Sequence, residues 1–299
     1  MPKTQRFGLQ RKIVANMTAE SWNGIPHACV TYEAEATGLL KVLGELNASR
    51  SADEAITINT AMLKVVAEGI LACPKMNGHI RYSRLLAGGS VTRYETVDVT
   101  MPVALDEDTM ITLNIRGVER KTIPEIQNAV TDSIRRAKNS HLDQALYEVA
   151  LYDTLKELKR LRLLRALGRF LGFWLEGGPR SLLHGAEKRR YLAIPETERL
   201  TRRDLEQGTV TVTNIGVLFR QWNVVCTMLE LIPPMIASVV INSLQDRTIV
   251  DPDGTIRAAK ILPLTIAFDH RALDASDIVP FMARLDQVFS APEQLNGFM

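Results

Sequence analysis

An apolar segment at residues 262–268 is the most strand-like stretch of the chain, and it ends abruptly at charged residues. Its sequence, LPLTIAF, is followed by Asp269, His270 and Arg271, with Asp274 four residues after the histidine. Segments rich in β-branched and aromatic residues predict a strand. The chain has only five histidines, so a histidine at the end of this strand makes the junction the first candidate for chemistry.

The rest of the chain alternates between strand-like and helix-like patterns. Period-two or β-rich patterns predict strands at 27–36, 92–105, 110–117, 208–219 and 235–242. Apolar residues at helical spacing, with capping signals, predict a short helix that stops before Pro26 and helices at 36–47, 57–73, 122–139 and 276–289. We expect Thr122 and Ser276 to be the N-caps of the last two helices. The order indicates a mixed α/β fold.

A basic segment separates two α/β parts, and we divide the chain into 1–139, 140–199 and 200–299. Residues 151–190 contain ten Lys or Arg against four acids, a net charge of +6. A helix at 162–175 has apolar residues on one face and arginines on the other. This pattern fits a helix on an anionic membrane surface or acidic carrier protein, and it equally fits a helix packed on its own core.

Bulk properties exclude several classes of protein. The net charge of +2 does not by itself imply a polyanionic partner, and we expect no nucleic-acid partner. Three dispersed cysteines favour a reducing, cytoplasmic compartment. The N-terminus lacks an apolar signal segment, and prolines interrupt the apolar stretch 224–241. Phosphate-binding loops and GxSxG are absent, and the remaining histidines show no metal-ligand spacing (His27, His79, His141, His184).

Two segments have residue types suited to catalysis. A histidine fixed at a strand end can take a proton from a thiol or hydroxyl near neutral pH. The segment GTVTVTNIG at 208–216 ends in a turn where a threonine hydroxyl could donate to an oxyanion. Taken alone, each also fits an ordinary surface loop or strand end.

The order of these segments resembles the catalytic core of 2-oxo acid dehydrogenase dihydrolipoyl acyltransferases. DHRALD at 269–274 is similar to that family's DHRxxDG, and TVTNIG at 211–216 to its TITNLG. LACPKMNGHI at 71–80 occupies the place of FPELNA. IPHACVTYEAEAT and IPPMIASVVI resemble the family's opening and the stretch after TITNLG. The resemblance covers the chain in order, except for about 140–199.

The resemblance implies a two-layer CoA-dependent acyltransferase fold with a mixed sheet, forming trimers with active sites between subunits. His270 would be the general base, Thr213 would stabilise the oxyanion, and Asp274 would orient the histidine loop through an arginine. The residues that would support the site are Arg11, Asn214, Gly216 and Arg271. Acyl transfer would be direct, from acyl-CoA or a lipoyl thioester to a thiol, alcohol or amine, with no covalently bound cofactor.

Departures from the family pattern leave alternatives open. Ala275 stands where the family has Gly, and no lipoyl-bearing domain or flexible linker precedes the core. A non-catalytic trimeric or cage-forming core and an acyl-carrier binding module therefore remain alternatives to the enzyme. Assembly of trimers into a 24-mer or larger cage, and peripheral membrane attachment through 151–190, stay open at this stage.

Overall fold

The structure is a computed structural model that describes residues 7–51, 54–106, 109–159 and 182–299. The predicted amphipathic helix at 162–175 lies outside these residues. The chain forms two compact units. The first comprises Met1–Ala19, Val103–Leu113 and Thr131–Glu206, and the second comprises Glu20–Pro102, Asn114–Val130 and Gln207–Met299.

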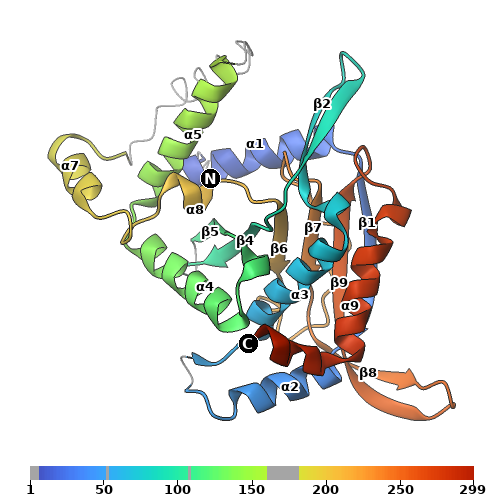
Figure 1. Cartoon of the computed structure of the whole chain (residues 1–299). Coiled ribbons are helices and arrows are strands. Elements are labelled where there is room, and N and C mark those ends of the chain that lie inside the picture. Colours follow the sequence, from blue (N-terminus) through green and yellow to red (C-terminus); the bar gives the residue numbers. More distant parts are fainter. Residues whose placement is uncertain (1–6, 52–53, 107–108, 160–181) are drawn as a thin grey trace, which may run out of the picture. The chain divides into compact units, whose positions relative to one another are not determined.

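The central element is a mixed sheet of seven strands in the part of the chain that the structure describes (Figure 1). Its path runs β1-β9-β7-β6-β4-β5, and β8 pairs with β9 beside that path. β6 is parallel to both β4 and β7, whereas β9 is antiparallel to β1, β7 and β8. The strands are β1 His27–Glu35, β4 Val99–Ala104, β5 Met110–Ile115, β6 Val210–Asn214, β7 Ala237–Ile241, β8 Gln245–Val250 and β9 Ile256–Asp269.

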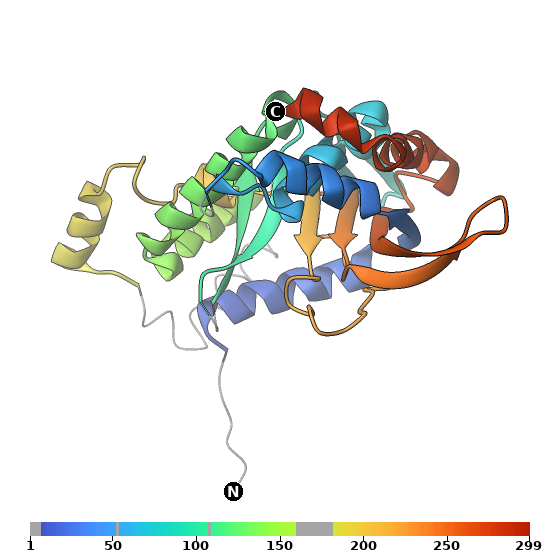
Figure 2. The ribbon, with the colours of Figure 1, turned by 90° about the horizontal axis from the view of Figure 1, so that it is seen from below.

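The other described elements are helices and a hairpin. The α-helices are α1 Leu9–Gly24, α2 Thr37–Asn47, α3 Ile58–Ala72, α4 Ile123–Lys138, α5 Leu142–Lys159, α7 Gly185–Ala193, α8 Arg202–Leu205 and α9 Val279–Ser290. Short 3-10 helices are η2 Pro74–Met76, η3 Val118–Arg120, η4 Ala275–Ile278 and η5 Pro292–Phe298. Within the second unit, α2, α3 and α9 lie over the same face of the sheet (Figure 2). The predicted two-layer α/β fold with a mixed sheet is confirmed.

The core of the second unit lies between α3, α9 and the sheet. Met62, Leu63 and Ile70 of α3 are fully buried, as is Phe281 of α9. At Gly69, a Cβ atom would lie 2.7 Å from the Phe281 ring. The missing side chain therefore lets α9 approach α3 closely enough to pack Phe281 inside.

A separate two-stranded sheet, β2 Gly78–Ser83 and β3 Gly88–Arg93, projects from the second unit as a hairpin (Figure 1). A single bridge between His79 and Met235 links its base to the segment before β7. His79 also bonds to the Gly208 carbonyl (2.7 Å) and to the Tyr94 hydroxyl (3.0 Å). The hairpin base is thereby fixed beside the start of β6.

Most sequence-predicted elements are confirmed with boundary shifts, but the strand predicted at 92–105 is divided between the end of β3 and β4. The helix before Pro26 begins at Leu9 and is longer than expected. The capping box at Thr122 is present, because the Thr122 N–H donates to the Glu125 carboxylate over 2.8 Å. None of the described helices is long and apolar enough to span a bilayer.

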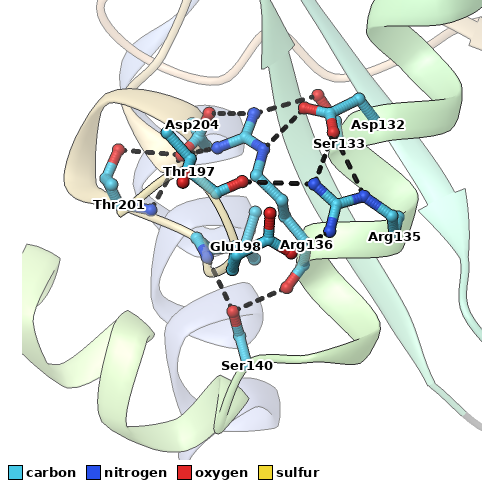
Figure 3. Close-up of polar contacts among 10 residues, drawn as sticks. Asp132, Ser133, Arg135, Arg136, Ser140, Thr197, Glu198, Thr201 and Asp204 are labelled. Carbon is cyan, nitrogen blue, oxygen red and sulfur yellow. Dashed lines mark hydrogen bonds and ion pairs between the residues drawn. The ribbon is translucent and has the colours of Figure 1, made fainter. Parts of the chain in front are cut away.

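In the first unit, the residues at the two ends of the predicted insertion lie close together. The Ser140 hydroxyl, just after α4, accepts a hydrogen bond from the Leu200 N–H over 2.6 Å. Arg136 of α4 donates two parallel hydrogen bonds of 2.8 Å to Asp204 of α8 (Figure 3). Ser140 and Leu200, at the two ends of the predicted insertion, are therefore joined directly in this unit.

The Arg136–Asp204 pair is largely removed from solvent, since the two side chains are 15% and 13% exposed. Although burial alone would raise the pKa of Asp204, the hydrogen bonds from Arg136 and Thr201 lower it below its ordinary value. Ala137, Leu113 and Leu200 form an apolar cluster in the same unit. The bidentate Arg136–Asp204 ion pair and this apolar cluster together attach the segment after the insertion to α4.

We expect Arg136→Met to destabilise the protein by about 2–4 kcal/mol, because it leaves the mostly buried Asp204 carboxylate without its partner. Denaturant unfolding measures this loss. Arg135→Met is the matched control: Arg135 is the adjacent residue and pairs with Glu198, but both side chains are nearly half exposed. A loss at Arg135 equal to that at Arg136 would contradict the assigned role.

Candidate active site

The candidate site begins with a carboxylate buried at the end of β9. Asp269 is 0% exposed and lies opposite His27 of β1 in the sheet register. Arg271 donates to it from Nε (2.9 Å) and Nη2 (2.6 Å), and the Arg271 backbone N–H adds a bond of 2.9 Å. A buried charge is tolerated only when it is paired and hydrogen-bonded in this way.

Arg271 also connects this strand end to two other segments. Its Nη1 donates to the carbonyl of Gly24, at the end of α1, over 2.6 Å. Its guanidinium carbon lies 5.2 Å from the ring centroid of Tyr82 in β2. Because one planar side chain makes all these contacts, the backbone on both sides of His270 is held in place.

His270 is presented from this anchored segment. Its backbone N–H donates to the Pro26 carbonyl over 3.0 Å, and its ring stands edge-on to buried Phe268. The side chain is 54% exposed, and Nδ1 lies 3.3 Å from Oδ1 of Asp274. With the ring neutral, this partner favours the tautomer with hydrogen on Nδ1. Nε2 then has its lone pair directed away from Asp274, available to accept a proton.

The loop after His270 differs from the sequence prediction. Asp274, rather than Ser276, is the residue before η4, and its N–H donates to the Asp277 carboxylate over 2.9 Å. The predicted N-cap at Ser276 is therefore wrong: the cap is Asp274, two residues earlier, and it forms a capping box with Asp277. Ala275 begins η4, and among the described non-glycine residues only Ala87 has positive φ. The turn accordingly places no demand for glycine at 275.

The arginine next to the histidine pairs with Asp269, not Asp274. Asp274 contacts His270 and Asp277. Arg11 lies in the part of α1 that belongs to the first unit. Its predicted pairing with Asp274 stays a prediction.

Thr213, Asn214 and Gly216 lie at the other end of the sheet. Thr213 of β6 is opposite Val240 of β7, which is opposite Thr265 of β9. His270 is therefore five residues further along β9 and two strands away. At about 3.3 Å per residue and about 4.8 Å per strand, the two side chains are roughly 15–20 Å apart within one chain.

The turn after β6 is closely packed. The Asn214 side chain accepts a hydrogen bond from the Val217 N–H over 3.3 Å. A Cβ atom at Gly216 would lie 2.5 Å from the Asn242 carbonyl oxygen. Glycine at 216 therefore permits the chain to pass against the end of β7, which fixes the backbone just after Thr213.

His27 is a second histidine near the site that sequence reasoning left without a role. Its Nε2 accepts a hydrogen bond from the Leu231 N–H over 3.0 Å and lies 3.2 Å from the Ser21 hydroxyl. Burial lowers the pKa of His27, and the Ile25 carbonyl and Asp269 oppose this only in part. The neutral ring thus ties α1 and β1 to the segment before β7, a structural role.

The family model for the 2-oxoacid dehydrogenases acyltransferase (catalytic domain) matches residues 3–148 and 186–296. The chain belongs to this family. The unmatched residues 149–185 fall inside the predicted insertion.

A curated relative shows how much of a full-length family member the chain spans. The chain is 22% identical over 284 residues to the dihydrolipoyllysine-residue acetyltransferase component of the pyruvate dehydrogenase complex of Zymomonas mobilis, covering 94% of this chain and 48% of that protein. Across three such relatives the covered share of the relative is 31%, 48% and 51%. The chain thus spans about half or less of their length.

Solved structures share the fold. The cubic core of the pyruvate dehydrogenase multienzyme complex aligns with a TM-score of 0.66 at 15% identity, covering 99% of this chain and 94% of that one. Dihydrolipoamide acetyltransferase from Azotobacter vinelandii, studied for the role of a serine, a histidine and an asparagine in its mechanism, gives the same TM-score, identity and coverage. At 15% sequence identity, this structural similarity shows that the proteins share a fold.

We predict that stability falls as pH falls below about 6.5, the ordinary histidine pKa, in part through His27. Its folded-state pKa is lowered, so the unfolded chain takes up the proton first. The contribution of His27 to stability is present at pH values above its pKa in the unfolded chain. It is lost as the pH falls through its pKa in the folded protein. Chemical unfolding at about pH 7.5 and about pH 5.5 measures the change on both sides of that pKa.

The matched variant is His27→Gln, whose amide can still accept from Leu231 but does not titrate in this range. We expect it to lose less stability than the parent protein between the two pH values. An equal loss in both proteins would show that His27 does not contribute to the pH dependence.

Proposed function

We propose that this protein transfers an acyl group between CoA and a dihydrolipoyl thiol, with His270 as the general base. The observation that carries the proposal is the anchored imidazole, half exposed, with Nδ1 facing Asp274. Family membership supports the reaction class. The histidine and asparagine studied in the Azotobacter vinelandii enzyme are four positions apart, the spacing of His270 and Asp274 here.

The proposed reaction proceeds by direct transfer. Nε2 of His270 takes the proton of the acceptor thiol, and the resulting thiolate attacks the carbonyl carbon of the acyl thioester. The negative charge moves to the carbonyl oxygen, which the Thr213 hydroxyl stabilises by donating a hydrogen bond. Collapse breaks the original C–S bond, and the leaving thiolate takes the proton back from His270. No acyl-enzyme forms.

Two chains are needed for this arrangement. The sheet register separates His270 from Thr213 by roughly 15–20 Å within one chain, too far for both to contact one reacting carbonyl. A cyclic trimer would place the Thr213 end of one chain against the His270 end of the next. Thr213, Asn214 and Gly216 would then belong to the neighbouring chain's half of each site. Formation of a larger cage from such trimers stays a prediction.

We expect His270→Ala to lower thiol release from acyl-CoA, with dihydrolipoamide as acceptor, by about 10²–10⁴-fold, the usual cost of removing a general base. His184→Ala is the matched control, because His184 is an exposed histidine at the start of α7. Unchanged activity in His270→Ala would contradict the role of the base.

Co-expression tests the shared site. We expect Thr213→Ala and His270→Ala to be inactive alone, but a trimer that contains chains of both kinds should regain about one third of its sites, because one boundary then joins an intact His270 to an intact Thr213. Different affinity tags isolate the mixed assemblies. Mixed assemblies that form but stay as inactive as each variant alone would contradict a site built from two chains.

A further inference from the structure

Two charged residues outside the DHRALD segment at 269–274 contact the loop that positions His270. Asp277 lies in η4, three residues after Asp274, and Lys75 lies in η2 at the end of α3. The Lys75 ammonium lies 2.6 Å from Oδ1 of Asp277. The two residues are 202 positions apart in the chain, so the tertiary fold alone brings them together.

The two oxygens of Asp277 have different partners. Oδ1 faces Lys75, while Oδ2 accepts the backbone N–H of Asp274 over 2.9 Å. Those same contacts, first the Asp274 N–H and then Lys75, lower the pKa of Asp277. The Asp277 carbonyl is also held, by the Cys73 thiol at 3.1 Å. Asp277 therefore fixes the backbone of Asp274 against the end of α3.

The contacts form a continuous chain from Lys75 through Asp277 and Asp274 to Nδ1 of His270. We propose that Lys75 and Asp277 are positioning residues that act through Asp274 to hold the His270 ring in the tautomer with a free Nε2. Neither residue touches the reacting atoms. The inference rests on the proposed role of His270 as base, because only then does the tautomer affect turnover.

Two residues of this sequence support the proposed arrangement. Lys75 occupies the position of Glu in the FPELNA segment, and a second carboxylate there would repel Asp277. Ala275 stands in place of the glycine after the family's aspartate. Here the turn after Asp274 is a 3-10 helix closed by the Asp277 cap. The lysine and the cap thus fix a turn that has no glycine.

The test uses Lys75→Met in the full chain, because this change removes the ion pair and leaves the cap in place. We expect kcat to fall about threefold to tenfold through loss of alignment, with little change in KM. Lys75→Arg, which keeps the positive charge, should retain most of the wild-type kcat. Asp277→Asn, whose amide oxygen can still accept from Asp274, should act in the same direction as Lys75→Met.

A spectroscopic readout separates positioning from a general structural role. In ¹⁵N-histidine-labelled protein at a pH about two units above the ordinary histidine pKa, where the ring is neutral, nitrogen shifts report the His270 tautomer. The His270 signal is the one that His270→Gln lacks. We expect Lys75→Met to move the population from hydrogen on Nδ1 toward hydrogen on Nε2.

Lys260→Met is the matched control, since Lys260 pairs with Asp246 at 2.7 Å in the same unit. It should change neither readout. An unchanged tautomer in Lys75→Met, whatever happens to kcat or thermal stability, would overturn the proposal. A shifted tautomer in a protein without acyltransferase activity would instead leave the positioning role standing and remove the proposed function.

Discussion

The buried Asp269–Arg271 pair is the interaction on which the candidate site depends. A carboxylate with no exposed surface requires compensation for the loss of hydration, and the planar guanidinium supplies it with two directed hydrogen bonds. The same guanidinium reaches the Gly24 carbonyl and the Tyr82 ring. A lysine, with a point charge on a flexible stem, lacks this planar fork. His270 lies between the two members of the pair, so its backbone is fixed from both sides.

The topology of the sheet then determines how the chemistry can be assembled. β9 ends where β6 and β7 begin, because β9 is antiparallel to β7 and β7 is parallel to β6. A base after β9 and a hydroxyl near the end of β6 must therefore be at opposite ends of one sheet. This separation follows from strand direction rather than from side-chain detail. It makes contact between chains the natural way to complete the site.

Sequence patterns predicted much of the fold for a physical reason. Apolar periodicity reflects which face of an element is buried, so β1, α3 and α4 were found with small boundary errors, whereas β9 begins at Ile256, before the predicted strand at 262–268. The position of His270 at a strand end also followed from the local pattern. Collinear motifs then identified the family, which the match over residues 3–148 and 186–296 confirms.

The contacts that determine the site's geometry were not predictable in this way. The Lys75–Asp277 pair and the link from His27 to Leu231 join residues more than 200 positions apart. Burial of Asp269 depends on its neighbours in β1 and β7. Ser276 was predicted to be an N-cap because serine is common at that position. In the structure Asp274 and Asp277 form the capping box instead, and the helical turn starts before Ser276. The predicted assignments for 162–175 lie outside the described residues.

The central claim is that His270 and Thr213 meet across a boundary between chains. The most direct measurement is the distance from His270 Nε2 to Thr213 Oγ1 in an experimental structure of the assembled protein with CoA bound. The account predicts one close pair for each chain, formed with a neighbour and enclosing the thioester position, while the distance within each chain stays roughly 15–20 Å. An assembly in which every His270 faces open solvent, with no neighbouring Thr213 beside it, would contradict the account.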